Sequence, residues 1–267
     1  MNWKKKLATY ASLTVLATFI IHIINKLIYF MSTIDNLLGR KEGLYYEWRF
    51  GKIFYTKEGT GKPILLIHDL SACSSEYEWN RIVSDLSKKN TVYTLDLLGC
   101  GKSDKPNFTY TNFLYVQLVT DFINNVIGEK ADVIVTGNSC SFVLMACHNN
   151  DEIIDRILLI NPPSISSISK VLKFIINIPF IGTLLFNLLH SKDSIEQTFM
   201  TEYFYNPQFV DDEIVKTYCE SAQISKTQSK YLFASIKGKY TTANITECLT
   251  HIDNSIFILV GSGNSRN

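Results

Sequence analysis

The chain begins with a long apolar segment and continues with short apolar runs that alternate with amphipathic ones. Residues 7–24 contain no Asp, Glu, Lys, Arg or Pro, and the apolar character extends to Met31. A helix of about 20 such residues is long enough to cross a hydrocarbon core of roughly 30 Å. We therefore expect residues 1–32 to form a membrane anchor that contacts the lipid bilayer through residues 7–31.

The charges on either side of this segment indicate its orientation. Lys4 to Lys6 precede it and favour a cytoplasmic N-terminus by the positive-inside rule, although Lys26, Arg40 and Lys41 follow on the other side. A cleaved signal peptide is the alternative, but it has a shorter apolar region and a small-residue cleavage site. We expect a single-pass membrane protein whose globular part lies outside the cytoplasm.

The remainder of the chain, residues 43–267, alternates predicted strands with predicted helices. The strands are continuous apolar runs, which are typical of strands buried on both faces of a parallel sheet. The clearest of them are Ile64–Ile67, Thr91–Leu95, Val133–Val135 and Arg156–Ile160. This alternation predicts one α/β domain, a mostly parallel sheet flanked by helices.

An insertion at about residues 163–254 separates the last two predicted strands. Residues 170–190 are strongly apolar, and Pro179 and Gly182 divide them into two helical pieces. We expect a helical cap packed over the cleft of the candidate active site, with Tyr203–Tyr205 in its core. A second membrane span is the alternative, which Lys173 and Pro179 disfavour.

Composition excludes several classes of function. Lys+Arg 26 against Asp+Glu 25 leaves a net charge of +1 without a basic patch, so nucleic acid is not an expected partner. The six cysteines and five histidines show no metal-ligand spacing, so no metal is expected. The two Gly-Lys pairs lack the earlier glycine of a phosphate-binding loop, and no cofactor is expected.

The candidate catalytic residue lies at a strand-to-helix turn. Gly137-Asn138-Ser139-Cys140-Ser141 follows the apolar run Val133–Val135 and matches G-x-S-x-G except at the last position. In such a turn the serine is held in a strained conformation with its hydroxyl exposed. We identify Ser139 as the candidate nucleophile. A turn of small residues without a catalytic role is the alternative.

Four segments together resemble a known family. They are His68-Asp69 after an apolar strand, the Asp96–Pro106 loop, which matches D-x-x-G-x-G-x-S-x-x-P, the Gly137–Ser141 turn, and Ile160-Asn161-Pro162. In order and spacing they resemble the α/β-hydrolase fold, over roughly residues 45–263. The resemblance implies an enzyme similar to serine esterases and lipases.

The resemblance also implies roles for particular residues. Ser139 would attack a carbonyl, and the oxyanion would be bound by the backbone N–H of Cys140 and that of Asp69 or Leu70. Asp69 stands where the family usually has glycine. A serine at the turn disfavours the dehalogenase-like and epoxide-hydrolase-like members, which place aspartate there. His68 is expected to brace its loop rather than act as the base.

The acid and the general base of the family are not found in this chain. The acid is expected three residues after Gly261, where Asn264 stands, and the histidine belongs after one further strand. The remaining histidines of the globular part are expected to be surface or packing residues: His148, His190 and His251. We interpret the chain as a hydrolase that lacks its C-terminal end or as an inactive relative.

The predicted function is that of a membrane-anchored serine hydrolase. Its substrate would be a small molecule, a carboxylic ester or related acyl compound, and the apolar cap favours an acyl chain. The alternative is a catalytically inactive or truncated α/β-hydrolase-fold protein that binds or interacts with a partner.

Overall fold

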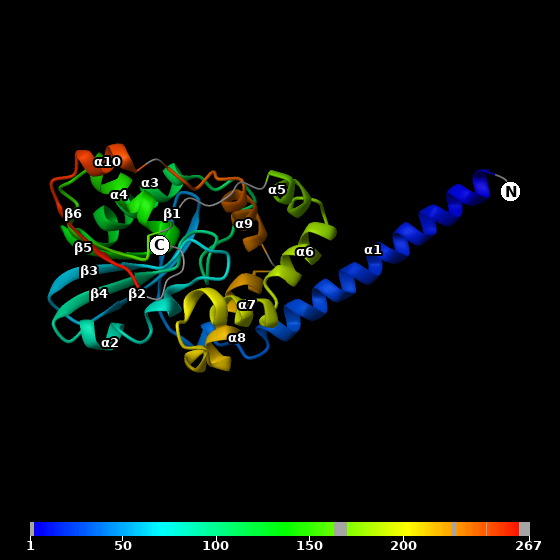
Figure 1. Ribbon diagram of the computed structural model, residues 1–267, viewed down its shortest axis with the longest axis horizontal. Coiled ribbons are helices and arrows are strands. Elements are labelled where there is room, and N and C mark those ends of the chain that lie inside the picture. Colours follow the sequence, from blue (N-terminus) through cyan, green and yellow to red (C-terminus); the bar gives the residue numbers. More distant parts are fainter. Residues whose placement is uncertain (1–2, 163–169, 226–227, 244, 262–267) are drawn as a thin grey trace.

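The fold is described from a computed structural model for residues 3–162, 170–225, 228–243 and 245–261 (Figure 1). Asn264, at the predicted acid position, lies outside these residues. The strands are β1 (Leu44–Trp48), β2 (Gly51–Glu58), β3 (Lys62–Ile67), β4 (Asn90–Leu95), β5 (Ala131–Thr136), β6 (Ile154–Ile160) and β7 (Ser255–Leu259).

These strands form one sheet in the order β1-β2-β4-β3-β5-β6-β7. The five strands from β4 to β7 in this order are parallel, and the hairpin β1–β2 adds antiparallel strands at one edge. The predicted mostly parallel sheet is confirmed. Ile67 of β3 is paired with Val135 of β5, so the segments that follow these two strands begin side by side.

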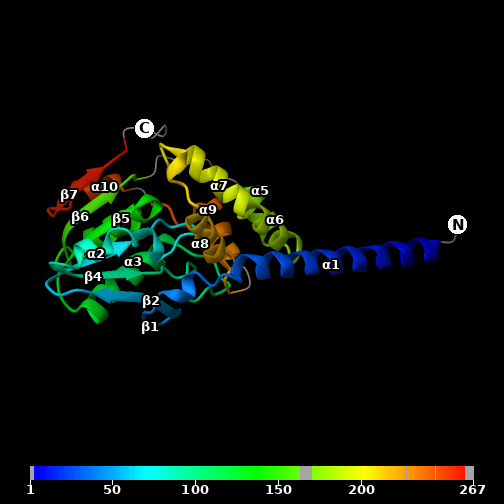
Figure 2. The ribbon, with the colours of Figure 1, turned by 90° about the horizontal axis from the view of Figure 1, so that it is seen from below.

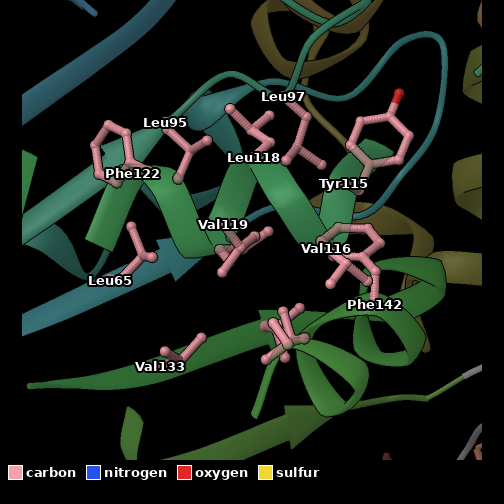
Figure 3. Close-up of a cluster of buried hydrophobic side chains, with 14 of the residues drawn as sticks. Leu65, Leu95, Leu97, Tyr115, Val116, Leu118, Val119, Phe122, Val133 and Phe142 are labelled. Carbon is pink, nitrogen blue, oxygen red and sulfur yellow. The ribbon is translucent and has the colours of Figure 1, made fainter. Parts of the chain in front are cut away.

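Helices cover both faces of the sheet. They are α2 (Val83–Leu86), α3 (Asn112–Phe122), α4 (Cys140–Asn149) and α10 (Thr246–Thr250). Figure 3 shows α3 packing Leu118, Val119 and Phe122 over Leu65 and Val133 of the sheet. Successive strand residues point to opposite faces, so Ile64 and Leu66 pack with Trp79 on the other side. The alternation explains why the runs Ile64–Ile67 and Val133–Val135 are apolar at every position.

The insertion folds as a helical cap, as predicted. Its helices are α5 (Lys170–Ile176), α6 (Ile181–Leu189), α7 (Lys192–Thr198), α8 (Asp212–Gln223) and α9 (Ser229–Lys237). The buried Lys105, in the loop after β4, ties the cap to the sheet domain. Its Nζ donates to the carbonyl of Ser221, 2.9 Å away, and to the hydroxyl of Ser229, 2.8 Å away.

Helix α1 (Trp3–Thr33) projects away from the body (Figure 2). Among the described residues it is the single helix long and apolar enough to cross a membrane, and none of its apolar window is buried. A signal sequence near the N-terminus can have the same length and apolar composition. On these two properties α1 is therefore a candidate membrane span. Its C-terminal half contacts the cap through Asn25, whose Oδ1 accepts from Nδ2 of Asn187 at 2.9 Å.

Candidate active site

The candidate site lies where β3 and β5 end. After β3 come His68, Asp69 and Leu70, and after β5 the chain turns at Gly137 into a single 3₁₀ turn (η4, Gly137–Ser139) that leads directly into α4. Gly137 has φ +53°, in the left-handed region that favours glycine. The strand pairing thus brings the two predicted halves of the site together.

Ser139 is not in the conformation that the motif predicts. Its backbone is helical (φ −68°, ψ −20°), and its side chain is fully buried. Its hydroxyl donates to the carbonyl oxygen of His68, 2.6 Å away. The expectation of a strained serine with an exposed hydroxyl is therefore wrong for this structure, because Gly137 takes the left-handed conformation and lets Ser139 join the helical turn.

The carboxylate of Asp69 fills the space in front of this turn. Its Oδ1 accepts from the backbone N–H of Asn138 at 2.6 Å and from Nδ2 of the same residue at 3.1 Å. A Cβ added to Gly137 would lie 2.2 Å from that oxygen. Gly137 is thus needed both for the backbone conformation and for the room that Asp69 occupies.

Two of the three predicted oxyanion donors are bonded to acceptors of the chain itself. The N–H of Cys140 donates to the carbonyl of Gly137 within the 3₁₀ turn, and the N–H of Asp69 donates to Oε2 of Glu78 at 3.1 Å. Leu70 is buried beside them. The prediction of an open oxyanion hole at Cys140 and Asp69 is wrong for this conformation. The N–H that does bind an anion belongs to Asn138.

His68 braces the loop, as expected. Its Nε2 accepts from the backbone N–H of Leu97 at 3.0 Å, so the ring proton is on Nδ1, which donates to the carbonyl of Asp69 at 2.7 Å. Complete burial lowers the pKa of this histidine to about 4. With both nitrogens bonded in this way, His68 does not accept a proton from Ser139.

The other histidines of the globular part have packing or surface roles, as expected. His190 is buried, stacks on Phe186 with ring centroids 4.2 Å apart, and has its pKa lowered to about 4 by burial. His148 and His251 are exposed, and their rings lie 5.9 Å apart. All five histidines belong to the described part of the chain, and within it no ring nitrogen is recorded in a bond to Ser139.

A second carboxyl group supports Asp69. Glu78 accepts from the hydroxyl of Thr136 and from the N–H of Asp69. Burial, and then the charge of Asp69, raise the pKa of Glu78 to about 7. Glu78 was not predicted from the sequence. The one signal for a further polar residue at this place was the unusual His-Asp pair after β3, because a buried Asp69 carboxylate requires polar groups from neighbouring segments.

One cap residue, Tyr203, is within range of the charge of Asp69. Tyr203 ends the π-helical turn η5 (Phe199–Tyr203), and the charge of Asp69 is the largest cause of its raised pKa. Tyr203 is 55% exposed and Tyr205 is 91% exposed. The prediction that Tyr203–Tyr205 form the cap core is therefore wrong for both tyrosines.

The Asp96–Pro106 loop, the most specific motif of the sequence, is structural. Asp96 is buried, and its two oxygens accept from the N–H of Glu76 at 2.6 Å and of Lys102 at 2.7 Å. A Cβ on Gly101 would lie 2.2 Å from this carboxylate, which explains the glycine. Among the described residues, no group of three or more His, Cys, Asp or Glu side chains is arranged to hold a metal ion.

The raised pKa of Glu78 predicts a pH dependence of stability. Between pH 4.5 and 7 the folded chain keeps this proton while the unfolded chain has lost it, so this group makes the free energy of unfolding fall as pH rises. Glu78→Gln removes that contribution. The difference in unfolding free energy, variant minus parent, should rise by at most about 1.4 kcal/mol per pH unit across this window. Urea unfolding in detergent at several pH values measures it.

The comparison with the parent is necessary because His68 and His190 act in the opposite direction. Their pKa values of about 4 mean that the unfolded state binds more protons below pH 6.5, which makes stability rise with pH. The matched control is Gln208→Ala, an exposed position without a titratable group, for which the difference should stay constant. A constant difference for Glu78→Gln would contradict the assignment.

Comparisons with known proteins agree with the fold and the motifs. The model of the alpha/beta hydrolase family matches residues 64–260, which is more than half of the chain. The chain therefore belongs to the alpha/beta hydrolase family. Together with the sheet order and the β3 and β5 loops, this defines the class of protein.

Two curated relatives are hydrolases. The chain is 34% identical over 86 residues to 2-hydroxy-6-oxo-6-(2'-aminophenyl)hexa-2,4-dienoic acid hydrolase of Metapseudomonas resinovorans, a match that covers 32% of this chain and 29% of the relative. It is 24% identical over 110 residues to the soluble epoxide hydrolase of Corynebacterium sp. (strain C12), with 41% and 38% covered. The matches thus span well under half of these relatives.

Solved structures share the fold over most of the chain. A meta-cleavage product hydrolase from Pseudomonas fluorescens IP01 aligns with a TM-score of 0.66 and 18% identity, covering 82% of this chain and 79% of that one. The enol-lactonase from Burkholderia xenovorans LB400 aligns with a TM-score of 0.64 and 15% identity, covering 82% and 81%. At these identities the likeness shows the fold alone.

Proposed function

We propose that this protein is a membrane-anchored serine hydrolase that acts on carboxylic esters or related acyl substrates, with Ser139 as the nucleophile. The observation that carries the proposal is the position of Ser139, at the start of α4 and directly after the central strand β5, beside the loop that follows β3. The membership of the family and the hydrolase relatives support the same reaction class.

The contacts of Ser139 indicate that the described conformation is a closed one. For attack on a carbonyl, the hydroxyl must leave the His68 carbonyl and give its proton to a base. The Asp69 carboxylate, which now accepts from the Asn138 N–H, must also move away, because its negative charge would repel an oxyanion that develops beside Ser139. The base is not identified among the histidines described above.

The same contacts favour a second candidate function. In a binding protein without catalysis, the bonds of Ser139 and Asp69 would be permanent and would simply hold the β3 and β5 loops together. Such a protein would use the family fold to bind or interact with a partner. Reactivity of the serine separates the two candidates.

The test is labelling of the full chain, reconstituted in lipid vesicles, with a fluorophosphonate probe. The matched control pair is Ser139→Ala and Ser141→Ala, because Ser141 is a neighbouring serine whose hydroxyl donates to the carbonyl of Asn138 at 3.2 Å. Labelling that is lost only in Ser139→Ala supports the hydrolase. Equal labelling of the parent and Ser139→Ala, or none in either, supports the second candidate.

Two further measurements test the rest of the proposal. Membrane anchoring predicts that the chain stays with the membrane after alkaline carbonate extraction, and release into the supernatant would contradict it. An acyl substrate predicts faster turnover of long-chain than of acetyl esters by an active form, because the cap is apolar. The opposite order would contradict the choice of substrate class.

A further inference from the structure

The hairpin formed by α5, the turn after it and α6, residues 170–189, stands at the edge of the body from which α1 projects. Figures 1 and 2 view the molecule from two directions, and in both this cap hairpin is the part of the body nearest to the free end of α1. A membrane crossed by α1 would therefore meet the cap hairpin before any other part of the body.

Direct contacts fix the cap hairpin against α1. At its tip, the carbonyl of Phe180 accepts from Nδ2 of Asn25 at 3.3 Å, and the Phe180 ring lies edge-on to His22 with centroids 6.2 Å apart. Asn187 bonds to Asn25 from the other end of α6. Between tip and helix is a shallow, mainly apolar groove of about 470 Å³, lined by Thr14, Val15, Thr18, Phe19, His22 and Phe180.

The surface of the cap hairpin is apolar and carries no acidic side chain. Residues 170–189 include two lysines and no Asp or Glu. Val171 is 71% exposed and Phe174 is 73% exposed, and they lie three residues apart on one face of α5. Phe180 and Ile181 at the tip are 45% and 51% exposed. Large apolar side chains clustered in this way on a surface mark a site of contact with a protein or a membrane.

The length of α1 sets the depth at which the cap hairpin would meet the bilayer. Residues 7–26 span about 30 Å at 1.5 Å per residue, which is the thickness of a hydrocarbon core, and Lys4 to Lys6 lie before it. The groove at Phe180 extends along α1 from His22, about 6 Å inside the outer end of this core, back toward Thr14. Interfacial elements bury their apolar face by about 5 to 10 Å, a comparable depth.

The polar side chains between α1 and the cap lie near the surface of the bilayer. Asn25, with Asn187, lies three residues beyond His22, at the outer end of this core and beside the lipid headgroups. Lys173 turns back toward the body, where its Nζ lies 3.8 Å from the centroid of the Tyr240 ring. The charge of Lys173 is thus directed away from the exposed apolar face of α5.

We propose that the cap hairpin is a second membrane-contacting element, whose tip and exposed α5 face insert into the leaflet beside α1. The partner is the lipid bilayer rather than a second copy of this chain, because the apolar tip, the polar pair and the free length of α1 coincide at one bilayer depth. The inference rests on the proposed anchoring by α1 but not on catalysis by Ser139.

The test places a tryptophan on the cap hairpin and measures its contact with lipid. The full chain carrying Phe174→Trp is reconstituted in phosphatidylcholine vesicles with brominated acyl chains, which quench nearby tryptophan. The matched control is Phe257→Trp on β7, a phenylalanine 56% exposed on the edge strand of the sheet, an element far from α1 in Figure 2. Emission is taken relative to the parent, whose three tryptophans are common to all variants.

We expect bromine to quench the emission added by Phe174→Trp strongly, and almost none of that added by Phe257→Trp, because acyl-chain atoms reach inserted side chains alone. Equal quenching at the two positions would overturn the proposal. So would shielding of Phe174→Trp that depends on protein concentration and not on lipid, since it would indicate a second copy.

A flotation measurement separates this proposal from the anchor and from the enzyme. If the parent chain does not float with the vesicles, the proposed anchoring and the proposed cap contact are both wrong. If it floats but Phe174→Trp is not quenched, the cap contact alone is wrong. Fluorophosphonate labelling of Ser139 is measured on the same vesicles and has no bearing on either result.

Discussion

Replacing Asp69 by glycine should increase the rate at which a fluorophosphonate labels Ser139 by about 10² to 10³. The Asp69 carboxylate now accepts from the Asn138 N–H and lies against Gly137. It would therefore repel the negative charge that develops beside Ser139 during labelling. Glycine removes the charge, frees the N–H and restores the residue type usual in the family. The measurement is the second-order rate of labelling of the full chain in vesicles.

Asp69→Asn is the informative companion. It removes the charge but keeps an acceptor for the Asn138 N–H, so its gain in rate should be smaller than that of Asp69→Gly. The double variant Asp69→Gly/Ser139→Ala should not label at all. If Asp69→Gly labels no faster than the parent, Asp69 does not close the site, and the reading of a binding protein without catalysis becomes the better one.

The fold was predictable because its signals are local and periodic. Apolar runs such as Ile64–Ile67 and Val133–Val135 are buried on both sides in the structure, and this requirement alone forces their composition. The insertion was recognised by the change from buried-strand patterns to apolar helical ones. The loop motif at Asp96 was predictive because, within the same loop, the N–H of Lys102 donates to the Asp96 carboxylate and Gly101 leaves room for it.

The candidate site was predictable in position but not in conformation. The turn at Gly137 and the loop at His68 come together because β3 and β5 pair, which their apolar patterns implied. Whether Ser139 is strained or helical depends on which residue of the turn takes the left-handed conformation, and in the structure this residue is Gly137. The bonds of Asp69 to Asn138 and of Glu78 to Thr136 join residues 58 or more positions apart, which no local pattern encodes.

The contact between α1 and the cap shows the same limit. The sequence predicted an apolar helix and an apolar hairpin separately, but not that Asn25 and Asn187 would bond to each other across 162 residues. A polar side chain near the end of an apolar helix is explained by interfacial hydration as well as by a partner. Only the folded chain distinguishes the two explanations.

Gly137→Ala should destabilise the protein by about 2 to 5 kcal/mol. A left-handed backbone costs a non-glycine residue about 1 to 2 kcal/mol, and overpacking a buried site adds about 1 to 3 kcal/mol. Both apply here, since Gly137 has φ +53° and its new Cβ would lie 2.2 Å from Oδ1 of Asp69. Urea unfolding of the full chain in detergent measures the loss.

Gly128→Ala separates the two causes. Gly128 also has a left-handed backbone, φ +77°, but a Cβ there would meet no atom within 4 Å, so this variant should lose only the backbone term of about 1 to 2 kcal/mol. In the Asp69→Gly background, the penalty of Gly137→Ala should fall to that same value, because the obstructing carboxylate is gone. An unchanged penalty in that background would mean that Asp69 does not occupy the space before Gly137. The closed conformation of the site would then be wrong, whatever the reactivity of Ser139.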